Sequence, residues 1–208
     1  MGSFLMHIGI SEIVRKRLNL STKFIYGSIL PDLVKMETGD RTGTHFLKTI
    51  VTDEGRKRLP VVGDAITMLN GKMNREVRLG YIAHLVEDLI WFEKYIPSFA
   101  KKIEEDRIVY IKDNSIHLAE EFSADTYEDY FKINAYIIAK YCKEYSSLKS
   151  ELEKQMTEQE VEILNRNDKI KKQETIDTNR IITKEGLDKY IEESVDKVEK
   201  IVKELMGE

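Results

Sequence analysis

The residues most suited to chemistry, by type and spacing, are a histidine and an aspartate one helical turn apart. His84 and Asp88 stand four residues apart in the stretch 80–91, GYIAHLVEDLIW, so on an α-helix both project from the same face. The rest of this stretch is mostly large and apolar, which predicts a buried helix. Burying an unpaired imidazole and an unpaired carboxylate is costly, and a divalent cation would compensate both. The alternative is an ordinary hydrogen bond, since such pairs also occur by chance.

Three further polar residues have settings that favour a metal site. His7 lies among apolar residues, Asp32 directly follows a proline that fixes the backbone, and His45 closes a loop that contains glycines. Each also has a structural interpretation, as a half-buried terminal histidine, a helix cap and a surface residue respectively. Together with the helical pair they make a nitrogen and oxygen donor set that suits one or two zinc ions, and another divalent metal fits the same donors. The candidate metal ligands are His7, Asp32, His45, His84 and Asp88.

Composition excludes several classes of partner. The chain has 208 residues, of which 34% are charged and 41% hydrophobic, with a formal net charge of −4. It has no cluster of basic residues interleaved with aromatic ones, so nucleic acid is not an expected partner. Its single cysteine, Cys142, excludes an intramolecular disulfide and is interpreted as a small core residue.

The sequence shows neither a secretory signal nor a membrane span. Its first residues, MGSFLMH, lack a basic region and a long apolar region, and no run reaches the roughly 18 apolar residues that a span requires. We therefore expect a cytoplasmic protein without stable membrane insertion. The sequence does not determine the oligomeric state.

Hydrophobic periodicity predicts an all-α fold. Residues 1–145 are expected to form a helical metal-binding core domain, and residues 146–208 a charged helical extension that packs on it. A loop is expected over 35–44, an exposed charged connection over 53–58, a short hairpin or extended loop over 107–112, and a mobile linker over 173–180. The predicted helices cover 4–20, 22–30 (ended by Pro31), 60–69, 74–94 (ended by Pro97), 123–145, a solvated hairpin within 146–172, and the residues after the N-cap Thr183.

The order of the candidate ligands resembles that of a known enzyme family. An early histidine, a Pro-Asp pair after an apolar turn, Thr44-His45-Phe46 and then GYIAHLVED over 80–88 are similar to the zinc-dependent phospholipases C of the alpha-toxin type and, more distantly, to P1-type nucleases. The resemblance covers roughly residues 4–95. It implies a multi-helix bundle of the phospholipase C/P1 nuclease type.

The resemblance also implies which residues hold metal. Asp32, His45, His84 and Asp88 would hold one zinc, and His7 with Asp88 would contribute to a neighbouring one, with Asp88 as the bridge. Two features of the family are missing, namely the N-terminal tryptophan and most of the third zinc site. His117 with Glu121 is either a remnant of that third site or a solvent-facing pair beside a loop, and we favour the second interpretation. The membrane-binding β-sandwich of the family is absent too.

The sequence therefore predicts a zinc-dependent phosphoester hydrolase, phospholipase C-like, acting on a small phosphoester or a phospholipid head group. Asp88 would be the central catalytic ligand, and Glu87 would orient a ligand imidazole or serve a structural role. Glu12 is a weaker candidate for general acid or base. Tyr81 and Trp91 would line the pocket or, by preference, pack in the core.

Two other classes compete with this function. One is a non-catalytic helical metal-binding or scaffold protein that keeps a structural zinc site, closed by four protein ligands. The other is an HD-type phosphohydrolase, which also places histidine and aspartate on helices. The sequence has no adjacent His-Asp dipeptide, which argues against the HD type.

Overall fold

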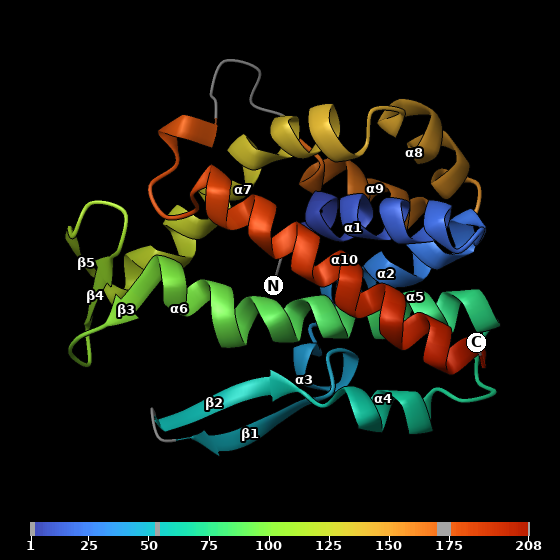
Figure 1. The fold of residues 1–208 in the computed structure, drawn as a ribbon, viewed down its shortest axis with the longest axis horizontal. Helices are drawn as coiled ribbons and strands as arrows, with labels where there is room; N and C mark the ends of the chain where they lie inside the picture. Colours follow the sequence, from blue (N-terminus) through green and yellow to red (C-terminus); the bar gives the residue numbers. More distant parts are fainter. Residues whose placement is uncertain (1–2, 53–54, 170–175, 208) are drawn as a thin grey trace.

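The computed structural model describes residues 3–52, 55–169 and 176–207, and within them the chain is mainly helical (Figure 1). The helices are α1 (Phe4–Arg17), α2 (Thr22–Thr38), α3 (Arg41–Thr44), α4 (Val62–Met68), α5 (Arg75–Ile90), α6 (Ile96–Phe99), α7 (Ala119–Tyr141), α8 (Tyr145–Glu153), α9 (Glu158–Asn167) and α10 (Lys184–Met206). A π-helix, Trp91–Tyr95, joins α5 to α6, and a 3-10 turn covers Ile176–Thr178. The strands are β1 (Leu47–Thr52), β2 (Gly55–Pro60), β3 (Ala100–Lys102), β4 (Arg107–Tyr110) and β5 (Ile116–Leu118).

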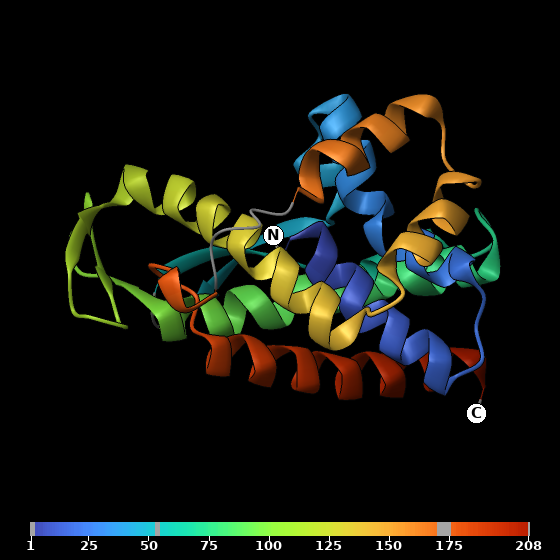
Figure 2. The same ribbon diagram turned by 90° about the horizontal axis from the view of Figure 1, so that it is seen from above.

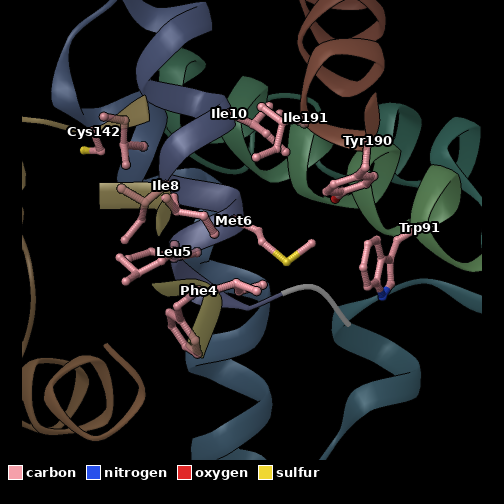
Figure 3. Close-up of a cluster of buried hydrophobic side chains, with 14 of the residues drawn as sticks. Phe4, Leu5, Met6, Ile8, Ile10, Trp91, Cys142, Tyr190 and Ile191 are labelled. Atoms are coloured by element: carbon pink, nitrogen blue, oxygen red, sulfur yellow. The ribbon is translucent and has the colours of Figure 1, made fainter. Parts of the chain in front are cut away.

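Helix α5 is the centre of the bundle. It packs against α1, α2 and α10, and α7 covers the far side of α1 (Figures 1 and 2). Figure 3 shows part of the resulting core, in which Ile10 of α1 and Ile191 of α10 face each other. Leu152 of α8 and Val198 of α10 belong to the same buried cluster as the residues of α1 and α5. The hydrophobic core therefore runs through both regions that the sequence analysis separates.

Two glycines let α2 and α5 touch backbone to backbone. A Cβ atom on Gly80 would lie 1.9 Å from the carbonyl oxygen of Phe24, and one on Gly27 would lie 2.1 Å from the carbonyl oxygen of Val77. No side chain larger than hydrogen fits at either position. The close approach fixes the spacing of the two helices that carry Asp32, His84 and Asp88.

The predicted N-cap at Thr183 is confirmed, because its side chain accepts from the backbone N–H of Gly186 at the start of α10. The Asn74 side chain likewise caps α5 by accepting from the backbone N–H of Glu76. The first predicted helix matches α1.

The prediction that Pro31 and Pro97 each end a helix is wrong. Helix α2 continues through Pro31 to Thr38, and the central helical segment continues through Pro97, which lies in the first turn of α6. A proline removes one backbone donor, but the packing of α2 along α5 outweighs that single loss. Pro97 lies in the first turn of α6, where a backbone N–H would have no intrahelical partner, so its missing N–H costs nothing there.

The loops expected around these helices are shorter than predicted. Residues 35–38 belong to α2, which ends at Gly39 with φ +74°, and 41–44 form the single turn α3. Pro60 ends β2 instead of starting α4. Helix α7 begins at Ala119, before the predicted residue 123.

The predicted all-α fold is incomplete, because the structure also contains two small antiparallel sheets. The connection expected over 53–58 belongs to a hairpin in which β1 pairs antiparallel with β2, residues 53–54 lying outside the described part. The residues 107–112, open between hairpin and loop, contribute β4 to a three-stranded antiparallel sheet in the order β3-β4-β5. Charged residues dominate 53–58, so the sequence shows little of the strand alternation that would predict pairing.

The described residues of the charged region, 146–169, contain α8 and α9 as expected, whereas the prediction of a mobile linker over 173–180 is wrong for its described residues. Ile176 is buried, and the Asp129 carboxylate accepts from the backbone N–H groups of Arg180, Ile181 and Ile182 at 2.9, 2.7 and 2.9 Å. This anchor joins α7 to the start of α10. Residues 170–175 lie outside the described part.

None of the helices that the structure describes has an apolar stretch long enough to cross a membrane.

The contact between α2 and α5 can be tested by adding one methyl group. We expect Gly80→Ala to lower the free energy of unfolding by roughly 1–3 kcal/mol or more, because its Cβ would overlap a backbone oxygen that cannot move alone. Thermal unfolding measures the change. The control is Gly63→Ala in α4, where nothing lies within 4 Å of the added atom. Equal melting temperatures for the two variants would contradict the close approach.

Candidate metal centre

All five predicted ligands converge in the interior. His7 comes from α1, Asp32 from α2, His45 from the residue after α3, and His84 and Asp88 from α5. Their exposed fractions are 0% or 1%. Four separate segments of the chain therefore bring imidazole and carboxylate groups to one buried place.

Three of the ligands stand at distances typical of one coordination sphere. The Nε2 atoms of His45 and His84 are 3.2 Å apart, and His45 Nε2 is 3.2 Å from Asp32 Oδ1. Ligand atoms about 2.0–2.2 Å from a tetrahedral zinc ion are separated by roughly 3.3 Å. The spacing thus matches what a single ion would impose.

Asp88 presents its two oxygens to different imidazoles. Its Oδ1 lies 3.8 Å from His7 Nε2, whereas its Oδ2 lies 3.8 Å from both His45 Nε2 and His84 Nε2. Two overlapping groups, His7-Asp32-His84 and His45-His84-Asp88, each have ligand atoms within 4.8 Å of one another. A carboxylate placed in this way is suited to bridge two neighbouring cations.

Hydrogen bonds on the outer side of the rings fix which nitrogen faces inward. His84 Nδ1 donates to the carbonyl oxygen of Ser28 at 2.7 Å. His45 Nδ1 lies 2.9 Å from the hydroxyl of Thr44, which itself donates to the carbonyl oxygen of Asp40 and so accepts from the ring. Both neutral rings therefore turn an Nε2 lone pair toward the other, and these lone pairs repel unless a cation or a proton lies between them.

Glu87 contacts the third imidazole, that of His7, at its Nδ1 atom. Its Oε2 lies 2.6 Å from His7 Nδ1, and both side chains are fully buried. Burial, and then the charge of Asp88, raises the pKa of Glu87 well above its ordinary value. The position suits the orienting role considered in the sequence analysis, and it lies outside the ring of ligand atoms.

The electrostatics of the cluster favour a divalent cation over protons. Burial and His84 lower the pKa of His7 to about 3, and burial also lowers the pKa of His84. Burial raises the pKa values of Asp32 and Asp88, but attraction to neighbouring basic groups outweighs it and keeps both below the ordinary value. The pKa values of two carboxylates, Asp32 and Asp88, are thus lowered while those of two imidazoles, His7 and His84, are lowered as well, and a divalent cation would compensate the buried carboxylates.

Unsatisfied polar atoms support the same interpretation. Among the residues that the structure describes, His7 Nε2 and Asp32 Oδ2 have no hydrogen-bond partner although they are buried. Buried polar groups are nearly always hydrogen-bonded, and ligands of an ion are the natural exception. The donor set thus fits a metal ion.

Glu12 and His117 lie outside this cluster. Glu12 forms ion pairs with Arg15 at 2.7 Å and Lys16 at 2.9 Å, so it is occupied on the surface side of α1. His117, on β5, stacks on Tyr110, and its Nδ1 is 3.8 Å from Glu121 Oε2. The side chain of Glu121 is 52% exposed, as expected for a solvent-facing pair.

Both aromatic candidates pack in the core, and Trp91 also lines a cavity. Tyr81 donates from its hydroxyl to the carbonyl oxygen of Thr44 at 2.5 Å, which fastens the segment before His45 to α5. Trp91 is fully buried beside Tyr190, and Figure 3 shows the two rings close together. Cys142 is buried as predicted, and burial raises the pKa of its thiol to about 11.

Sequence reasoning missed two basic residues next to the cluster. Lys35 Nζ lies 3.7 Å from Asp32 Oδ1, and Arg41 is one turn before His45, whose N–H donates to the Arg41 carbonyl oxygen. The i, i+3 spacing of Asp32 and Lys35 would have shown the first contact if the helix had been continued past Pro31. No sequence signal points to the second.

Comparison with known proteins adds nothing to this geometry: no family model, no curated protein and no solved structure matches the chain.

Loss of the Glu87 carboxylate should weaken metal binding without destroying the site. We expect Glu87→Gln to lower the affinity for zinc by about 10- to 100-fold, because the His7 imidazole loses the carboxyl group that orients it. Competition with a chromogenic chelator measures the affinity. The control is Glu93→Gln in the π-helix, where the side chain is exposed. Equal affinities for both variants would show that Glu87 does not orient a ligand.

Proposed function

We propose that this protein is a metal-dependent phosphoester hydrolase, phospholipase C-like in fold and site. The observation that carries the proposal is the convergence of three imidazoles and two carboxylates, with Nε2 atoms only 3.2 Å apart and facing inward. The mainly helical fold and the order of the ligands along the chain agree with the resemblance to zinc-dependent phospholipases C.

The residues divide naturally between two positions. Asp32, His45 and His84 would hold one ion, and His7 the other, with the two oxygens of Asp88 shared between them. Zinc suits this set of neutral imidazole nitrogens and carboxylate oxygens. Glu87 would keep His7 in the tautomer that directs Nε2 inward.

Bound divalent ions would supply acidity to a water molecule and withdraw charge from phosphoryl oxygens. In the net reaction the water oxygen bonds to phosphorus, the bond from phosphorus to the ester oxygen breaks, and a water proton ends on the alcohol that leaves. The chain itself holds the donors rigidly, because each ring has an outer hydrogen bond and no ligand is exposed to bulk water. A small phosphoester or a phospholipid head group is the proposed substrate.

Burial of every ligand favours a second candidate, a structural metal site without turnover. A structural site is closed by protein ligands, whereas a catalytic site keeps an open position. A cavity of about 30 Å³ that reaches Asp32 argues for the open site, because it is large enough for a water molecule. Its other walls include Phe4, Met36 and Tyr127.

Metal content and hydrolysis, measured on the same samples, decide between the candidates. We expect wild type to contain zinc by mass spectrometry and to hydrolyse chromogenic phosphodiesters. His84→Ala and Asp88→Asn should lose metal, and turnover should fall by at least about 100-fold, because each removes an atom of the proposed coordination sphere. Metal-loaded wild type that hydrolyses neither mono- nor diesters would favour the structural site.

The matched control is His117→Ala. It removes the fourth histidine of the chain, which stacks on Tyr110 away from the cluster. We expect it to retain both metal and turnover. Loss of metal in this variant would overturn the assignment of ligands.

A further inference from the structure

A second, larger cavity lies beside the metal centre. It has a volume of about 240 Å³ and shares Tyr127 and Tyr130 of α7 with the narrow cavity that reaches Asp32. These two tyrosines therefore stand between the candidate metal ligands and the larger cavity. A molecule in the larger cavity would lie next to any group bound at the metals.

The walls of this cavity are aromatic and apolar. Rings predominate among them, with a few small polar side chains such as Ser123 and Thr126 at the side of α7. The apolar and aromatic walls are Trp91, Phe92, Ile96, Phe122, Tyr127 and Tyr130. Such a lining binds apolar groups by removing them from water.

The volume limits what fits. A cavity of about 150 Å³ accepts a benzene molecule, and sites for drug-sized ligands begin at about 300 Å³. A space of about 240 Å³ therefore suits one aromatic ring or a short branched alkyl group. It is too small to enclose two long acyl chains.

One positively charged side chain, that of Arg41, lines this cavity among the described residues. Among the lining residues that the structure describes, Arg41 is the charged one, and its guanidinium carbon lies 5.6 Å from the centre of the Phe92 ring. Within residues 3–52, 55–169 and 176–207, no carboxylate forms an ion pair with Arg41. Its side chain is exposed, so its five N–H donors remain available to an anion.

The same turn positions Arg41 and the ligand His45. The backbone N–H of His45 donates to the carbonyl oxygen of Arg41 at 3.1 Å, and Tyr81 holds the carbonyl of Thr44 between them. Both Asp32 and Arg41 act on Tyr127: burial and then Asp32 raise its pKa, and Arg41 lowers it. Arg41 therefore lies on the same turn as a candidate ligand and lines the cavity next to it.

We propose that this cavity is the specificity site for the proposed hydrolase, accepting a single aryl or short alkyl ester group while Arg41 binds the anionic phosphoryl oxygens. The inference rests on the proposed function for the reaction but not for binding. A cationic ester group such as choline is disfavoured here, because Arg41 would repel it.

Binding can be tested without turnover, because the only tryptophan of the chain, Trp91, lines the cavity. Phenylphosphonate, whose carbon–phosphorus bond is not hydrolysed by such an enzyme, should change Trp91 fluorescence in the metal-loaded protein. It should bind about 10-fold or more tightly than methylphosphonate, since the ring leaves water. Equal affinities for the two phosphonates would overturn the proposal.

Two variants separate the charge from the cavity. Arg41→Gln should weaken phenylphosphonate binding by about 10- to 100-fold with unchanged metal content. Ser123→Phe should fill the mouth of the cavity and remove the preference for phenyl over methyl. Arg107→Gln, on the middle strand β4 of the three-stranded sheet, is the matched control and should bind as wild type. Wild-type affinity in Arg41→Gln would contradict the role of this residue.

Hydrolysis of three p-nitrophenyl phosphodiesters that carry methyl, phenyl or choline as the second ester group completes the test. We expect the phenyl ester to have the highest kcat/KM and the choline ester to gain in Arg41→Gln relative to the methyl ester. Phosphonate binding without hydrolysis of any ester would remove the proposed function and leave the cavity assignment standing. Hydrolysis of all three at equal rates would remove the cavity assignment alone.

Discussion

The contact between the backbones of α2 and α5 is the constraint on which the centre of this protein depends. Gly27 and Gly80 remove the side chains that would separate the two helices. The carbonyl oxygen of Ser28 is then near enough to accept from His84 Nδ1 at 2.7 Å. One helix thus orients a ligand of the other through its main chain, and Asp32, one turn further along α2, reaches the same place.

This arrangement of buried polar groups costs stability. Five buried polar side chains occupy a position that apolar residues would fill at lower cost, and they do so with inward lone pairs and carboxylates that repel one another. The outer hydrogen bonds, from Glu87, Ser28 and the hydroxyl of Thr44, keep the rings from turning away. A cluster held in this way is organised before any ion arrives, and an ion that binds it stabilises the folded chain.

The turn α3 lies between the candidate metal centre and the adjoining cavity. His45, the residue after α3, belongs to the first, Arg41 of α3 lines the second, and Tyr81 fastens the turn to the central helix. Because α7 contributes Tyr127 and Tyr130 to both spaces, a small movement of α7 relative to α3 would change access to the centre and the shape of the cavity together.

The sequence by itself determined the helical character, the cap at Thr183 and the five candidate ligands, because helical periodicity, capping and residue chemistry are local properties. Only the tertiary structure decided that Pro31 stays inside a helix, that charged residues around 53–58 pair as strands, and that Asp129 anchors the residues before α10. It also decided that Arg41 faces an aromatic cavity. These outcomes depend on contacts between segments far apart in the chain, whose energies exceed the local preferences that a sequence displays.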